Sequence, residues 1–146
     1  MRELPRKLTT HELAELFEGR TRLVERLAEI EDPLGRADEV VASLTDEEKL
    51  EALYAHPAIG QRAGLSPRSA AEQGDDSKPG VLDELARLNA EYEERFGFRF
   101  VVFVNRRPKS EILDTLRQRI RRTREEELDT GCCELVAIAR DRWTRT

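Results

Sequence analysis

The sequence predicts an all-α protein, a single-domain helical bundle with one long irregular loop and one short extended connector. Apolar residues recur at helical spacing over most of the chain, and two Thr-x-x-Glu patterns mark helix starts. Only residues 98–104 have the short, continuous apolar character of a strand. The 146 residues fit one domain, so we expect residues 1–146 to form it, with residues 1–7 flexible.

The N-terminal half should contain three helical segments. Thr9-x-x-Glu12 is a capping-box pattern that opens the first segment, and Thr45-x-x-Glu48 is another that opens the third. Helical spacing continues through Ile30, and Asp32-Pro33 should end the first segment. The third helix should stop at His56, because the following proline disfavours a helical residue before it. The apolar positions of these segments are Leu13, Leu16, Phe17, Leu23, Val24, Leu27, Ile30, Val40, Val41, Leu44, Leu50, Leu53 and Tyr54.

The stretch from Ala58 to Gly80 interrupts this pattern. It contains several glycines and prolines, namely Gly60, Gly64, Pro67, Gly74, Pro79 and Gly80. Loops of this length inside a compact domain are usually functional or disordered. We therefore expect this loop to carry part of an active site.

Three further helices should complete the bundle. The first carries Leu82, Leu85, Leu88, Tyr92 and Phe96 on one side, with Gly97 as its C-terminal cap. Phe98–Val104 should follow as a buried extended connector. A second helix should start near Pro108, and the last should begin after Gly131.

Composition argues against several classes of protein. The formal net charge of −5 argues against non-specific binding to nucleic acid. The chain contains no run of about 18 apolar residues and no apolar signal core near Met1, so neither a membrane span nor secretion is expected. Cys132 and Cys133 are adjacent and make a poor disulfide framework, and we expect them to be buried at a helix start. A cytoplasmic location is the simplest expectation.

Histidine is scarce, so each histidine is a candidate for acid–base chemistry. His11 lies among charged residues in a first helical turn and is interpreted as an ordinary surface residue. His56 ends a helix, precedes a proline and opens the long loop. A helix C-terminus favours the imidazolium form, and a histidine that titrates near neutrality can donate or accept a proton. Local context leaves open whether His56 is catalytic or simply a surface residue at a helix end.

Ser69, Glu72 and Gln73 are the second candidate set, and they lie within the long loop. They offer a hydroxyl, a carboxylate and an amide, which suit a small ligand rich in N–H and C=O groups. Ser69-x-x-Glu72 could equally be a capping-box helix start with no ligand. Both interpretations stay open at this point.

Arginines are concentrated near the end of the chain. Arg142 could hold a carboxylate through a two-pronged hydrogen bond, although its pattern is that of a polar position on an amphipathic helix. The chain has no zinc-ligand spacing, no phosphate-binding glycine motif and no Gly-x-Ser-x-Gly elbow, so no metal is expected. A solvated helix face, rather than a nucleic-acid patch, is the interpretation of Arg117, Arg119, Arg121, Arg122 and Arg124.

Several segments, in their order and spacing, resemble the 2-oxo-4-hydroxy-4-carboxy-5-ureidoimidazoline (OHCU) decarboxylase family. They are His56-Pro57-Ala58-Ile59-Gly60, Ser69-Ala70-Ala71-Glu72-Gln73, Leu88-Asn89-x-x-Tyr92-x-x-Arg95-Phe96-Gly97-Phe98-x-Phe100 and Glu134-Leu135-Val136-x-Ile138-Ala139-x-x-Arg142. The likeness covers the chain from about Leu8 onward and is densest from His56 to Phe103.

The resemblance implies an all-helical, cofactor-free and commonly dimeric carboxy-lyase that forms (S)-allantoin during urate degradation. It implies three catalytic residues: His56 as proton donor, Glu72 near the reacting centre and Arg142 as an anchor for the substrate. A small-molecule substrate and a homodimer are therefore expected, and neither nucleic acid nor a membrane is an expected partner. The substrate-binding residues that it implies are Pro57, Ser69, Ala70, Ala71, Gln73, Phe100, Val101, Val102, Phe103 and Val104.

Two other interpretations stay open. A related decarboxylase or lyase could act on another ureido compound in the same pocket, since Ala58 and Asn105 depart from the family's pattern. A non-catalytic helical interaction module could instead use the arginine-rich helix, with Arg117 and Arg121, as its contact surface. The second alternative gives no role to the long loop.

Overall fold

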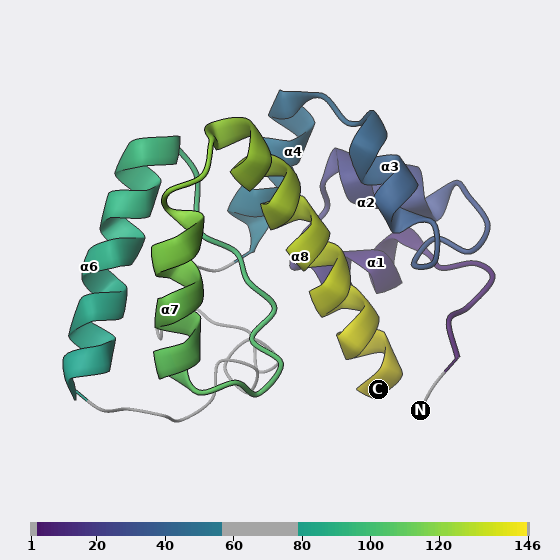
Figure 1. The fold of residues 1–146 in the computed structure, drawn as a ribbon. Coiled ribbons are helices and arrows are strands. Elements are labelled where there is room, and N and C mark those ends of the chain that lie inside the picture. Colours follow the sequence, from purple (N-terminus) through teal and green to yellow (C-terminus); the bar gives the residue numbers. More distant parts are fainter. Residues whose placement is uncertain (1–2, 57–78, 146) are drawn as a thin grey trace.

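A computed structural model describes residues 3–56 and 79–145, and over these residues it is helical, with no strand. Its helices are α1 (Thr10–Phe17), α2 (Arg22–Ala28), α3 (Ala37–Ser43), α4 (Asp46–Ala55), α6 (Pro79–Phe96), α7 (Lys109–Arg119) and α8 (Arg124–Arg145). Helix α8 packs against α1, α3 and α4, and α6 packs against α7 at the other end of the molecule (Figure 1). The predicted all-α class is confirmed.

The helix starts at Thr9 and Thr45 were predicted from the sequence, and the structure confirms both. In each capping box the threonine hydroxyl accepts a hydrogen bond from the backbone N–H three residues on, and the glutamate carboxylate accepts one from the threonine N–H. Helix α4 also ends as predicted, because His56 takes an extended conformation with ψ 137°. The first predicted segment is wrong in two respects. It is divided into α1 and α2 at Glu18, whose φ of 66° ends α1, and α2 ends at Ala28, ahead of Asp32-Pro33.

The last helix begins seven residues before Gly131 rather than after it, so that prediction is wrong. Helix α8 starts at Arg124, where the Thr123 hydroxyl accepts from the N–H of Glu126 and the Glu126 carboxylate accepts from the N–H of Thr123. Gly131 therefore lies inside the helix. A Cβ at Gly131 would stand 2.9 Å from Cδ2 of Leu53, so the glycine permits close packing of α8 on α4.

The cysteines also differ from expectation. Cys132 and Cys133 lie in the interior of α8 rather than at a helix start, and they are not joined in a disulfide. Cys132 is buried, which raises the pKa of its thiol to about 12, whereas Cys133 is exposed. The sequence predicts no function for either cysteine, and neither belongs to the candidate site described below.

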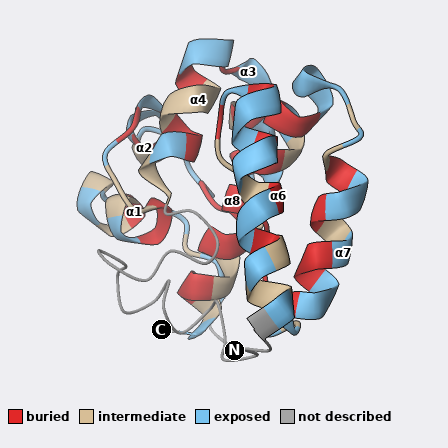
Figure 2. Cartoon of the chain, turned by 90° about the vertical axis from the view of Figure 1, so that its left-hand side faces the viewer, coloured by how far each residue is buried: buried red, intermediate tan, exposed pale blue. Residues whose placement is uncertain are grey.

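The extended connector lies at the centre of the molecule. Helix α6 ends at Gly97, whose φ of +81° is readily adopted only by glycine, and the chain then runs extended and largely buried from Phe98 to Val104. Buried residues line the inward sides of the helices beside it (Figure 2). An aromatic cluster of Tyr92, Phe96, Phe98 and Phe100 packs at the junction of α6 and the connector, with ring centroids 4.6–6.0 Å apart.

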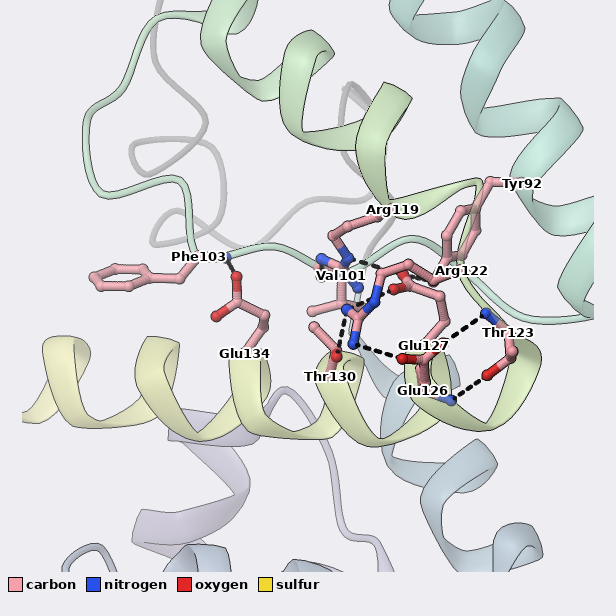
Figure 3. A network of polar contacts seen from close by, with 10 residues as sticks. All are labelled: Tyr92, Val101, Phe103, Arg119, Arg122, Thr123, Glu126, Glu127, Thr130 and Glu134. Atoms are coloured by element: carbon pink, nitrogen blue, oxygen red, sulfur yellow. Dashed lines mark hydrogen bonds and ion pairs between the residues drawn. The ribbon is translucent and has the colours of Figure 1, made fainter.

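A buried polar network ties the connector to α6, α7 and α8 (Figure 3). The fully buried Glu127 carboxylate accepts hydrogen bonds from the Tyr92 hydroxyl at 2.7 Å, Arg119 Nε at 2.8 Å and Arg122 Nη1 at 3.0 Å. Arg119 Nη1 also donates to the Val101 carbonyl at 2.6 Å. The prediction of a solvated arginine face is therefore wrong for Arg119, because a neighbouring helix supplies a buried carboxylate that no local pattern reveals.

Candidate active site

His56 is held at the end of α4 through its own backbone. Its N–H donates to the Leu53 carbonyl at 3.2 Å, and its carbonyl accepts a hydrogen bond from Arg99 Nη1 at 2.9 Å. Arg99 comes from the connector, so the helix end and the connector are linked at this residue. The backbone of His56, to which the imidazole is attached, is therefore fixed by hydrogen bonds on both its N–H and its carbonyl.

The imidazole of His56 is set in a desolvated, positively charged environment. Its Nδ1 is buried and has no hydrogen-bond partner among the described residues. Burial, with the positive charges of Arg142 and Arg99, lowers the pKa of His56 to about 4, and the negative charge of Glu18 acts in the opposite direction. The ring is therefore neutral at pH 7, and the sequence-based expectation that the helix C-terminus favours imidazolium is outweighed.

Arg142 approaches the same region from α8. Its side chain is 1% exposed, and its Nη1 lies 3.0 Å from Oε1 of Glu18 and 3.0 Å from the carbonyl oxygen of Leu16. Residues 56 and 142 are far apart in the sequence, and the packing of α4 on α8 brings the Arg142 charge close enough to act on the His56 imidazole. A neutral base beside a buried guanidinium can transfer a proton next to a bound anion.

The connector residues predicted to bind substrate through their backbone are buried, apart from the half-buried Phe103. The Val101 carbonyl accepts from Arg119, and the Phe103 and Val104 carbonyls accept from the Arg107 guanidinium at 2.6 and 3.1 Å. The Phe103 N–H donates to Glu134 at 3.4 Å (Figure 3). The Val101 and Phe103 carbonyls each keep a second lone pair for a ligand, whereas the Val104 carbonyl also accepts from the N–H of Arg107 at 2.9 Å and has both lone pairs occupied. Phe100 and Val102 complete the predicted set.

The remaining predicted site residues are Pro57, Ser69, Ala70, Ala71, Glu72 and Gln73, and they lie outside the described residues. Sequence reasoning did not single out Glu18 or Arg99, which the structure adds beside His56. The sequence contains little sign of Glu18 beyond its place before Gly19 at the end of a helix. Its proximity to His56 depends on how α1 packs.

A surface depression lies elsewhere, lined by Glu91, Arg95, Ile120 and Arg121 at the adjoining ends of α6 and α7. None of the predicted site residues lines it, so it is not the candidate active site. Within residues 3–56 and 79–145, no three His, Cys, Asp or Glu side chains gather in a way that could hold a metal ion. In the same residues no helix is long and apolar enough to cross a membrane.

The arrangement of helices is similar to that of two solved structures. The crystal structure of OHCU decarboxylase in the presence of (S)-allantoin matches with a TM-score of 0.74 and 22% identity, over 92% of this chain and 96% of that chain. The crystal structure of (S)-allantoin synthase matches with a TM-score of 0.70 and 23% identity, over 93% of this chain and 48% of that one. These likenesses show that the chain shares the all-helical fold of those two structures.

The family follows from the sequence itself. Residues 2–144 match the family model described as OHCU decarboxylase, so the chain belongs to the OHCU decarboxylase family. A relative from Haloferax volcanii, named 2-oxo-4-hydroxy-4-carboxy-5-ureidoimidazoline decarboxylase, is 30% identical over 136 residues, which are 86% of this chain and 80% of the relative. The uric acid degradation bifunctional protein of Bacillus sp. strain TB-90 is 30% identical over 109 residues, and the match covers only 21% of that longer protein.

Proposed function

We propose that this chain decarboxylates OHCU to (S)-allantoin in the degradation of urate. Membership of the family over residues 2–144 supports the reaction class. The observation that carries the proposal is that the buried Arg142 guanidinium of α8 acts electrostatically on the desolvated His56 imidazole at the end of α4. A neutral imidazole and a fixed guanidinium are the groups that a decarboxylation with stereospecific protonation requires.

The proposed reaction starts with the substrate carboxylate, on a ring carbon that also bears a hydroxyl. The carbon–carboxylate bond breaks, carbon dioxide leaves, and the electron pair moves toward the neighbouring ring imine, whose nitrogen takes a proton. The hydroxyl then loses its proton as the ring carbonyl forms, and the neighbouring carbon gains one. The net uptake is one proton from solvent, and the ring itself accepts the electrons, so the reaction as written needs no cofactor.

The residues are assigned by what each can do at neutral pH. His56 is neutral, because burial holds its pKa at about 4, so it accepts a proton first and then delivers it to one face of the ring. Arg142 anchors an anionic part of the substrate, and Glu72 orients the hydroxyl or the histidine. Protonation from one face alone gives the (S) product.

The test follows optical activity during turnover. Substrate is generated in place from urate with urate oxidase and hydroxyisourate hydrolase, and the full chain is then added while circular dichroism is recorded. A rapid (S)-allantoin signal that is absent with His56→Ala supports the proposal. Slow racemic decay at the rate of a protein-free sample overturns it, and activity on another ureido compound is then examined.

Three properties complete the proposal: one domain over residues 1–146, a homodimer and a cytoplasmic location. The extent of the family match supports the first, and the family resemblance supports the second. The unpaired Cys132 and Cys133 fit a reducing compartment. Light scattering coupled to gel filtration decides the second, because a mass near twice the 16.8 kDa chain supports the dimer and a mass near that of one chain contradicts it.

A further inference from the structure

Glu18 lies at the end of α1 in an uncommon backbone conformation. It has φ 66° and ψ 21°, in the left-handed region that residues other than glycine rarely adopt, and its N–H donates to the Ala14 carbonyl to cap the helix. The next residue is Gly19, where an added Cβ would stand 3.3 Å from the Cβ of Ala55. The end of α1 is therefore packed tightly against the end of α4, one residue before His56.

This packing brings the Glu18 carboxylate to Arg142. Oε1 of Glu18 lies 3.0 Å from Nη1 of Arg142, and the two side chains are 14% and 1% exposed. The same Nη1 donates to the Leu16 carbonyl, two residues before Glu18. One end of α1 thus supplies two acceptors to a single nitrogen of the guanidinium.

We propose that Glu18 is a positioning residue, which holds the Arg142 guanidinium in a fixed orientation beside His56 so that it can receive the substrate. The proposal rests on the proposed function, in which Arg142 anchors the substrate. Glu18 itself does not touch the reacting atoms. It acts through Arg142, and its effect on turnover should disappear when Arg142 is absent.

The charges around His56 support this role. Arg142 from α8 and Arg99 from the connector are positive, and Glu18 from the end of α1 is the acidic group that acts on the imidazole among the described residues. A buried guanidinium without a carboxylate partner loses a charge-assisted hydrogen bond and reorients to find another acceptor. An arginine that moves in this way no longer presents the geometry that two-pronged binding of an anion requires.

The first experiment measures steady-state turnover of OHCU by Glu18→Gln, which removes the charge with little change in shape. We expect kcat/KM to fall by about tenfold or more, chiefly through a higher KM, because a weakened anchor binds the substrate less well. Glu15→Gln is the matched control, since Glu15 is exposed on the same helix and pairs with His11. It should match the wild type. A Glu18→Gln variant with wild-type KM and kcat overturns the proposal.

A double variant separates positioning from a general effect on folding. If Glu18 acts only through Arg142, Glu18→Gln/Arg142→Gln should have the same kcat/KM as Arg142→Gln within about twofold. A further loss in the double variant, similar to that of Glu18→Gln alone, overturns the proposal. This comparison holds even if Glu18→Gln does not fold, because the double variant removes both buried charges together.

A second readout does not need substrate. In the wild type the Arg142 guanidinium should give resolved Nη signals in nitrogen-15 NMR, since its rotation is restricted, and Arg142→Lys assigns them. Glu18→Gln should broaden or merge these signals, and Glu15→Gln should leave them unchanged. Unchanged Arg142 signals in Glu18→Gln overturn the inference. If the wild-type chain does not turn over OHCU, the proposed function fails, while this measurement still decides whether Glu18 holds Arg142.

Discussion

At the scale of the residue, two influences act on the His56 imidazole in opposite directions. The C-terminal end of α4 favours a positive charge, whereas burial and the neighbouring Arg142 and Arg99 disfavour it. Burial is the largest of these effects, and the pKa of His56 falls to about 4. At neutral pH the imidazole is therefore uncharged, and its first step in catalysis is to accept a proton.

Replacing His56 should therefore abolish most turnover. We expect His56→Ala to lose at least about a hundredfold in kcat, which is the lower range for removal of general acid–base catalysis. The measurement is the initial rate of (S)-allantoin formation by circular dichroism. His11→Ala is the matched control, since His11 is exposed on α1 and should be replaceable without loss. Turnover by His56→Ala within a few fold of the wild type would remove His56 from the mechanism.

At the scale of the element, the connector depends on side chains from three helices. Arg119 of α7 contacts the Val101 carbonyl, stacks at 4.6 Å over the Phe100 ring and pairs with Glu127 of α8. The Tyr92 hydroxyl of α6 donates a hydrogen bond to the same carboxylate, and burial and Glu127 raise the pKa of this hydroxyl. The network fixes the extended segment that is expected to line the pocket.

Breaking this network on one side should destabilise the protein strongly. Arg119→Met leaves the Glu127 carboxylate buried with one fewer cation, and we expect a loss of about 3 kcal/mol in the free energy of unfolding. Urea denaturation measures it. Arg117→Met, on the exposed side of the same helix, should change stability by less than about 0.5 kcal/mol. The double variant Arg119→Met/Glu127→Gln should recover part of the loss. Equal stability of Arg119→Met and Arg117→Met would contradict the assignment.

The end of α6 offers a test of backbone conformation alone. Gly97 has φ +81° and nothing within 4 Å of an added Cβ, so Gly97→Ala should cost about 1 kcal/mol through backbone strain only. Gly80 also has open space around an added Cβ but lies in the first turn of α6, where Gly80→Ala should be neutral or slightly stabilising. The midpoint temperature of thermal unfolding should therefore fall for Gly97→Ala, and for Gly80→Ala it should stay unchanged or rise slightly.

At the scale of the whole molecule, the depressed pKa of His56 links its protonation to global stability. The unfolded chain binds a proton at His56 below about pH 6.5, whereas the folded protein does so only below about pH 4. The unfolded state therefore binds more protons within this window, and stability falls as the pH is lowered through it. Above pH 6.5 both states are neutral at this residue and the effect vanishes.

We expect the His56 contribution to the free energy of unfolding to fall by roughly 2 kcal/mol between pH 7 and pH 5. Urea denaturation at the two pH values measures the change. His56→Gln cannot titrate at this position and should show a smaller loss, so the difference between the variants isolates His56. An identical pH dependence in the two proteins would show that His56 is solvated in the folded state.

Much of this helical fold could be predicted locally. The capping boxes at Thr9 and Thr45, the proline after His56 and the glycine at 97 act on their immediate neighbours, and the structure confirms each boundary. The prediction for the start of α8 is wrong because Gly131 resembles a helix boundary, whereas the capping box of Thr123 and Glu126 begins the helix at Arg124. The glycine is explained only by Leu53 on another helix.

The sequence by itself determined the helical class, most helix boundaries, the family resemblance and His56 as a candidate, since these depend on spacing and on adjacent residues. Only the tertiary structure decided which charges are buried and which side chains meet. It placed Arg119 against Glu127 inside the core, and it brought Glu18 and Arg142 beside His56. Burial and Coulomb interactions depend on distances in space, which residues 18, 56 and 142 do not reveal through their positions along the chain.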